Sequence, residues 1–225
     1  MFSNRVFLTG FTINTKNVKI AVAMKDKNQM LTFEQIDTIK EVGNICVGNS
    51  TGILSQLLGS KVEMYLPGLD ILAPKQMAEY IKEKGKLVYG VNAQIASHLQ
   101  GAIFLLFPEG DSLKIIDKFI AGVNTEGLNH TQFGISIIKE IGGIALFSYI
   151  NTLSSLIKKL ILSSVPNFLS GTVNELLQLV LREYEHWGNV CVVHTAFREI
   201  GMGVEGSFYL ILNKKSADLI LKALK

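Results

Sequence analysis

The sequence predicts an α+β fold, duplicated internally about a pseudo-two-fold axis, with one continuous, mostly antiparallel sheet and two long helices packed on it. Three observations predict this fold. A nine-residue phrase occurs twice, as IDTIKEVGN at residues 36–44 and ISIIKEIGG at residues 135–143, with five identical positions 99 residues apart. The similarity continues through both halves in the same order. Each half also shows the same succession of helical and strand patterns.

The repeat extends to the end of each half. QGAIFLLF at residues 100–107 matches EGSFYLIL at residues 205–212, and SLKIIDKFI at residues 112–120 matches SADLILKAL at residues 216–224. An accidental resemblance would not keep its order and spacing over this length, so we interpret it as an internal duplication.

The duplication predicts how the chain is organised. Residues 1–30 form an N-terminal extension, and residues 31–225 form one domain made of two repeats, at residues 31–122 and 128–225. The joint between the repeats is expected in VNTEGLN, residues 123–129. Two halves that each carry an open sheet edge would most economically merge into one sheet.

In the first half, a long helix is expected at Phe33–Leu58. A capping box of Thr32 and Gln35 marks its start, and Gly59 marks its end. The other elements are expected, in order, as a strand at 61–66, a helix at 74–83, strands at 87–96 and 101–107, and a terminal helix that includes 112–120.

The second half repeats this order. Its long helix is expected at about 132–158, with Asn129 and Gln132 placed as Thr32 and Gln35 are. The elements after it are expected as a strand at 160–165, a helix at 170–185, strands at 190–198 and 203–212, and a terminal helix that includes 216–224.

Composition excludes several classes of protein. A hydrophobic content of 48% in 225 residues predicts a well-buried fold, and a net charge of +3 is too small to indicate nucleic acid. The only cysteines, Cys46 and Cys191, indicate buried thiols in a reducing cytoplasm. The longest charge-free run, residues 141–157, is short and polar for a membrane span, and no secretion signal is visible, so we expect a buried helix in a cytoplasmic protein.

One stripe of the first long helix carries unusual side chains. At about 100° per residue, Asp37, Glu41 and Asn44 fall within an arc of about 60°. We expect this stripe to face solvent as a shallow surface against which another protein can lie flat. Asn44 is costly in a helix interior, by some tenths of a kcal/mol relative to Ala. Towards the helix end the stripe continues with the small residues Gly48, Thr51 and Ser55.

A proline follows the motif at the same distance in both copies, as Pro67 and Pro166. We interpret these prolines structurally, because proline ends a strand by removing a backbone donor. Gly43, Gly142 and Gly143 are interpreted as sites of close helix packing.

Asp37, Glu41, Asn44 and Pro67 resemble the signature of the CheC, FliY and CheX family of chemotaxis phosphatases. This signature is Asp or Ser, three residues, Glu, two residues, Asn, then 22 residues before Pro, and the first copy matches it at every position. Two copies in a chain of this length are similar to the CheC branch. The resemblance covers residues from about 31 to 225.

The resemblance implies hydrolysis of phosphoaspartate on a CheY-like response regulator. Asn44 would position the attacking water, since a carboxamide offers a donor and an acceptor in fixed geometry. Glu41 would pair with the regulator's lysine, and Asp37 would add charge at the rim. No cofactor of the chain's own is implied, because magnesium is bound by the partner regulator. The deamidase CheD is a further partner that the resemblance allows.

The second copy departs from this pattern. Ser136, Glu140 and Pro166 conform, but Gly143 stands where the family has Asn. The second site is therefore expected to be catalytically dead, or nearly so. Glu140 without its Asn could still dock a regulator unproductively.

Two bulky apolar residues also enter the second stripe. Phe147 replaces Gly48, and Ile150 replaces Thr51. We expect both to be exposed unless a partner protein covers them, or the chain's own N-terminal extension does, since residues 6–23 include strand-like runs.

Two other functions are left open. A non-catalytic adaptor would bind a regulator, CheD or a flagellar switch component without hydrolysis. An ordinary small-molecule enzyme would need a catalytic constellation between the halves, and the sequence shows none. Its four histidines have no metal-ligand spacing, and neither Ser50 nor Thr51 has a histidine nearby in sequence.

Overall fold

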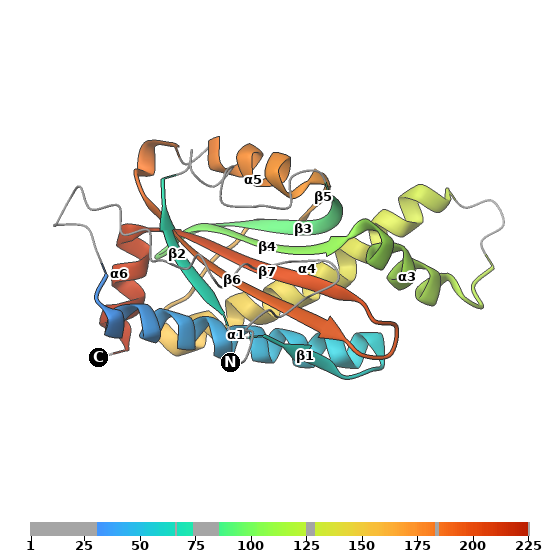
Figure 1. Ribbon diagram of the computed structural model, residues 1–225, viewed down its shortest axis with the longest axis horizontal. Helices are drawn as coiled ribbons and strands as arrows, with labels where there is room; N and C mark the ends of the chain where they lie inside the picture. The colour runs from blue at the N-terminus through green and yellow to red at the C-terminus, as the bar shows by residue number, and fades with distance from the viewer. Residues whose placement is uncertain (1–30, 66, 74–85, 125–128, 183–184, 225) are drawn as a thin grey trace, which may run out of the picture.

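A computed structural model of the protein describes residues 31–65, 67–73, 86–124, 129–182 and 185–224 (Figure 1). In these ranges the chain folds as helices packed on a single sheet. In chain order the elements are α1 (Phe33–Leu58), β1 (Val62–Met64), β2 (Gly68–Leu72), β3 (Leu87–Ala96), β4 (Gln100–Pro108), α3 (Glu109–Ile120), α4 (His130–Ile157), β5 (Asn167–Thr172), α5 (Val173–Arg182), the 3-10 helix η2 (Glu185–Trp187), β6 (Val190–Glu199), β7 (Glu205–Asn213) and α6 (Lys214–Ala223).

The described strands form one seven-stranded sheet in the order β1-β6-β7-β4-β3-β5, with β2 also paired to β6. All of their pairings are antiparallel. The two halves exchange their outer strands: β1 and β2 of the first half pair with β6 of the second, and β5 of the second half pairs with β3 of the first. The duplication therefore yields one continuous sheet, as predicted.

The two faces of the sheet are covered differently. The long helices α1 and α4 lie across one face (Figure 1), where they bury the larger core together with residues of α3 and α6. Helix α5 contributes to a smaller core on the other face. Among the described helices, α4 alone is long and apolar enough to cross a membrane, and half of its most apolar stretch is buried inside the protein. Because that stretch packs in the main core, α4 is a core helix, as predicted.

The predicted ends of the long helices are confirmed. Thr32 and Gln35 form a capping box, with side-chain to backbone hydrogen bonds of 2.7 and 3.2 Å. Gly59 ends α1 in the left-handed conformation at φ 64°. Asn129 caps α4 by accepting from the backbone N–H of Gln132 at 3.1 Å.

The predicted strand at 160–165 is wrong as a regular element. Only an isolated bridge joins Ser163 to Ile95 of β3. Two serine hydroxyls intervene: the N–H of Gln94 donates to the Ser164 hydroxyl, and the N–H of Leu162 donates to the Ser97 hydroxyl, both at 3.0 Å. Side-chain partners of this kind replace the carbonyls that a regular ladder uses. The regular strand, β5, begins after Pro166 instead.

Other boundaries also differ from the prediction. The helix expected at 170–185 begins at Val173, because Thr172 and Glu175 form a capping box that leaves the preceding residues in β5. Strand β2 was not predicted, since GLDIL is short and lacks alternation. The helix expected at 74–83 and most of the joint at 123–129 lie outside the described residues.

Candidate functional site

Glycine fixes how α1 lies on the sheet. A Cβ atom at Gly43 would lie 2.7 Å from Cγ1 of Val193 on β6, and one at Gly142 would lie 2.5 Å from Cγ2 of Val91 on β3. Both helices therefore approach the strands more closely than any other residue allows, as predicted for these two glycines. This packing turns the side of α1 that carries Glu41 away from the sheet.

Glu41 and Asn44 are available to a visiting molecule. Glu41 and Asp37 are exposed, and Asn44 is half-buried. Within the described part of the chain, the Asn44 carboxamide makes no hydrogen bond, and neither carboxylate forms an ion pair. One turn of helix separates Glu41 from Asn44. An acid and an amide, both uncommitted, thus share one accessible stripe of α1.

The rest of this stripe turns inward. Gly48 is half-buried, with a Cβ position 3.9 Å from the sulfur of Met64, and the Ser55 hydroxyl donates to the backbone carbonyl of Ser60 at 2.7 Å. Thr51 was expected at the surface, and this is wrong, since it is only 4% exposed. The shallow surface is therefore shorter than predicted and ends near Gly48.

Two different contacts surround this part of α1. The Asn49 amide of α1 donates to the Thr152 hydroxyl of α4 at 3.0 Å, so the two helices meet there. Thr51 lies on the other side of α1, because residues two apart in a helix are about 200° apart. That side faces β1, since a Cβ atom at Gly48, one turn before Thr51, would lie 3.9 Å from the sulfur of Met64. Ile150, the counterpart of Thr51 on α4, belongs to the main core. The expectation that Ile150 is exposed is likewise wrong, because it is 3% exposed.

The second site lacks its amide and is partly filled. Ser136 and Glu140 are exposed on α4, as their counterparts are on α1. Gly143 is buried, and a Cβ atom there would lie 3.4 Å from Cγ of Pro166. Phe147 is 42% exposed, as expected. An aromatic ring thus replaces the open surface that Gly48 leaves in the first half.

Each proline was predicted to end the first strand of its half, but in the described chain no regular strand lies between α4 and Pro166, and β1 ends before Pro67, at Met64. Pro67 separates β1 from β2, and Pro166 separates the bridge at Ser163 from β5. By the duplication, Pro67 stands relative to Asn44 as Pro166 stands relative to Gly143. In the second half the Pro166 ring lies beside Gly143, the counterpart of Asn44.

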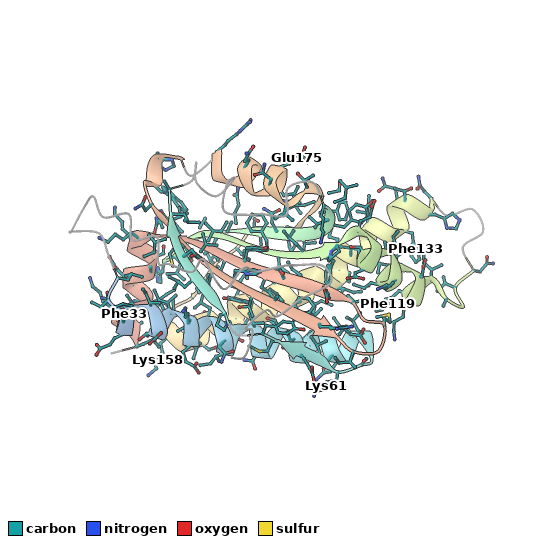
Figure 2. All side chains as sticks on the ribbon, in the orientation of Figure 1. Phe33, Lys61, Phe119, Phe133, Lys158 and Glu175 are labelled. Carbon is teal, nitrogen blue, oxygen red and sulfur yellow. The ribbon has the colours of Figure 1, made fainter. Side chains whose placement is uncertain are left out.

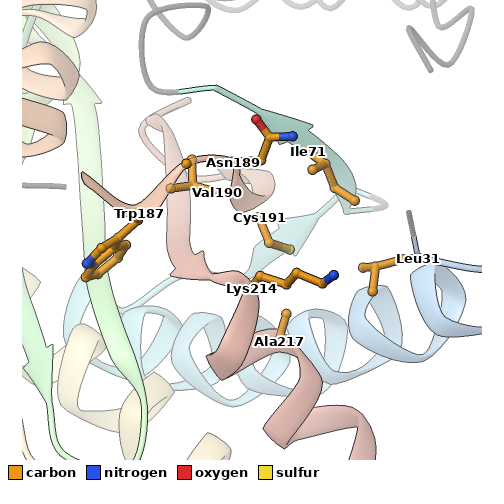
Figure 3. A pocket seen from close by; sticks show the side chains of 9 residues that line it. Leu31, Ile71, Trp187, Asn189, Val190, Cys191, Lys214 and Ala217 are labelled. Atoms are coloured by element: carbon orange, nitrogen blue, oxygen red, sulfur yellow. The ribbon is translucent and has the colours of Figure 1, made fainter. Parts of the chain in front are cut away.

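A small cavity lies away from this stripe (Figure 3). Its volume is about 120 Å³, and its lining includes Leu31, Trp187, Cys191 and Lys214. Burial raises the pKa of the Cys191 thiol to about 12, which keeps it protonated and poorly nucleophilic. The cavity residues include no acid or histidine, so they do not make a hydrolytic constellation.

No metal site is found among the described residues, where no three His, Cys, Asp or Glu side chains converge. His194 stacks on Tyr209 with ring centroids 4.5 Å apart, and burial lowers its pKa to about 4. It is a neutral, half-buried histidine at ordinary pH. The sequence did not single out Asn49, whose signal is the same as that of Asn44, an asparagine inside a helix.

Comparison with known proteins finds relatives that carry the predicted family name. CheY-P phosphatase CheC of Bacillus subtilis is 26% identical over 162 residues, which cover 71% of this chain and 78% of the relative. The chain is therefore similar to CheC of the CheC/FliY/CheX family. A scan against models of protein families finds no match.

Solved structures of CheC-family and related proteins share the fold. FliY of Thermotoga maritima superposes with a TM-score of 0.67 at 21% identity, covering 87% of this chain and 98% of its own. A chain in the FliG–FliM complex of H. pylori superposes with a TM-score of 0.59 at 13% identity, covering 85% of this chain and all of its own. The predicted CheC-like fold is thus confirmed.

Proposed function

We propose that the protein is a phosphatase for the phosphoaspartate of a CheY-like response regulator, with Glu41 and Asn44 as its working site. The observation that carries this proposal is the pair of uncommitted polar side chains on one accessible stripe of α1. The CheC relative is named a CheY-P phosphatase, which supports the substrate class. CheY-like response regulators act in the cytoplasm, so this function implies a cytoplasmic protein.

The Asn44 carboxamide enters the regulator's site and holds a water molecule in line with the phosphorus. The water oxygen bonds to phosphorus while the bond from phosphorus to the aspartyl oxygen breaks. The products are the free carboxylate and inorganic phosphate, and the water proton leaves with the phosphate. The partner regulator binds the magnesium, so the chain needs no cofactor of its own.

Glu41 acts as the docking group. Its carboxylate is exposed one turn before Asn44, so it pairs with a cation of the regulator while the amide enters the site. Asp37, a further turn towards the start of α1, adds negative charge at the rim. Gly48 keeps the surface low enough for the regulator to approach.

Phosphate release from a phosphorylated regulator tests the proposal. Asn44→Ala is expected to lower the rate on the order of 10²-fold or more, as the loss of one positioned hydrogen-bonding group does. Glu41→Ala is expected to weaken docking, and Gln56→Ala, on an exposed part of α1 outside the stripe, to change nothing. Equal rates for the wild type and Asn44→Ala would refute catalysis by this site.

The second candidate is a non-catalytic adaptor with the same fold. The loss of the amide at Gly143 and the fold's occurrence in the FliG–FliM complex favour it. It predicts that the protein binds a regulator, CheD or a flagellar switch component and leaves the phosphate in place. The phosphate-release assay decides between the two, because an adaptor adds no hydrolysis to the regulator's own.

A further inference from the structure

The second half carries an exposed apolar segment between α4 and β5. Leu160, Leu162 and Val165 are 68%, 56% and 72% exposed, and we call these three residues the apolar edge. They lie where the chain runs beside β3 through the bridge at Ser163. Three neighbouring apolar side chains exposed to this extent on a sheet margin indicate a surface that something covers.

Two of the three corresponding positions in the first half are charged, and the third, Leu66, is the counterpart of Val165. The duplication pairs Lys61 with Leu160 and Glu63 with Leu162. Lys61 and Glu63 form an exposed ion pair of 2.7 Å, and Arg198 stands opposite Glu63 on β6. The sheet margin at β1 is therefore polar and suited to contact with water, whereas the corresponding margin in the second half is apolar. The difference between two copies of one architecture shows that the apolar edge is a particular property of the second half.

The chain is longer than the part that matches FliY, and a segment of suitable length precedes α1. The FliY structure matches 98% of its own length but 87% of this chain, and the unmatched share is about as long as the thirty residues before Leu31. We propose that this segment, residues 1–30, packs over the apolar edge of the same chain. The proposal does not depend on the phosphatase function.

The sequence of the segment fits this position. Residues 18–23 read VKIAVA, so in an extended conformation Val18, Ile20 and Val22 point to one side. Residues 24–30 read MKDKNQM, a polar and charged stretch suited to a linker in water. The segment thus offers an apolar face for the edge and a solvated connection to α1.

The linker is long enough to reach the end of α4, next to the edge. Figure 2 shows Phe33 and Lys158 towards the same end of the molecule, as expected for antiparallel helices that meet through Asn49 and Thr152. Lys158 lies six residues after Thr152, so in antiparallel helices it lies beside the part of α1 that is six residues before Asn49, near Gly43. That position is about ten residues, or about 15 Å, along α1 from Phe33. Seven extended residues span up to about 23 Å. Residues 24–30 are therefore long enough to span from the start of α1 to the end of α4 at Lys158, four residues before Leu162.

Thiol crosslinking in the full chain tests this contact. Ile20→Cys with Leu162→Cys is expected to give a crosslinked monomer with a short bismaleimide, at a yield independent of protein concentration. The matched control combines Ile20→Cys with Glu63→Cys at the charged margin and is expected to give none. The native thiols of Cys46 and Cys191 are buried and do not compete.

Other crosslinking outcomes overturn the proposal. Crosslinked dimers would show that a second copy covers the edge, and no crosslink would leave the edge to another protein. A second measurement uses the labelling rate of Leu162→Cys. Replacing Val18, Ile20 and Val22 by Ser is expected to raise this rate several-fold and to leave labelling of Glu63→Cys unchanged. An unchanged rate at both positions would refute the contact independently of any loss of folding.

Discussion

Gly143 of α4 packs against Pro166, whose Cγ atom lies 3.4 Å from the position of a Cβ atom on that glycine. This is an ordinary contact distance, so Pro166 would accept a Cβ atom at Gly143 without moving. The first atom of a side chain therefore fits at the position that lost the amide. One turn further along α4, Phe147 stands where the first half has Gly48.

This geometry predicts that the second site can be restored. In a chain inactivated by Asn44→Ala, adding Gly143→Asn together with Phe147→Gly is expected to recover part of the phosphate release. Asn44→Ala with Phe147→Gly lacks the amide and should stay inactive. Thermal melts check that all variants fold. No recovery in a folded triple variant would show that Glu140 and Ser136 no longer dock a regulator.

The close approach of α1 to the sheet predicts a large difference between two glycines of the same helix. Gly43→Ala forces a methyl group against the stiff, buried Val193 and is expected to lower the free energy of unfolding by about 1–3 kcal/mol. Gly52 is exposed with open space around it, so Gly52→Ala should raise that free energy by about 0.5–1 kcal/mol. Urea unfolding of both variants measures the difference, and equal effects would contradict the packing described here.

Glu199 ties the turn between β6 and β7 to the end of α1. Its carboxylate accepts from the backbone N–H groups of Gly201 and Met202, both at 2.8 Å. Burial alone would raise the pKa of this carboxyl, but hydrogen bonds from the Ser60 hydroxyl and from the backbone bring it below the ordinary value of 4.5. A lowered pKa means that the folded state favours the charged form.

Stability should therefore depend on pH through Glu199. Its contribution is fully present above pH 4.5, the ordinary pKa, and is lost as the pH falls through the lower folded value. At pH 7, Glu199→Gln is expected to cost about 1–3 kcal/mol of unfolding free energy, because it breaks a buried network. The difference in unfolding free energy between Glu199→Gln and the wild type should narrow as the pH falls, which urea unfolding at each pH measures. The same gap at pH 7 and pH 3 would exclude this linkage, and Glu63→Gln serves as the exposed control.

The two native thiols are expected to be unreactive until the protein unfolds. Burial raises the pKa of Cys46 and of Cys191 to about 12, so both stay protonated at pH 8. Ellman's reagent should label neither residue in the native protein and both in urea. Glu63→Cys, which introduces an exposed thiol, gives the reference rate. Rapid labelling of the native wild type would contradict the buried placement of the thiols.

The sequence predicted the elements that local pattern determines. Helix α1 and strand β3 have the predicted bounds, because a capping box, a terminal glycine and a continuous apolar run mark them. The prediction of a strand at 160–165 was wrong. The hydroxyls of Ser164 and Ser97 bind backbone N–H groups only once this segment lies beside β3. The periodicity of a sequence segment does not show which strand will lie beside it.

The predictions for the candidate site also divide into those that local pattern decides and those that tertiary packing decides. Glu41 and Asn44 were placed on an accessible stripe correctly, because helical geometry alone decides which side chains share a face. Thr51 was placed on that stripe and lies buried, because β1 packs near this part of α1 and the period of one helix does not report such a tertiary contact.

The crossed pairing of β1 and β2 with β6, and of β5 with β3, has a consequence for how one half could exist alone. A lone repeat would leave the hydrogen-bonding groups of its outer strands unmatched, so it would need a second copy with which to trade those strands. Holding both halves in one chain makes this pairing independent of protein concentration. It also allows the halves to differ in sequence, so that one carries an exposed ion pair where the other exposes leucines.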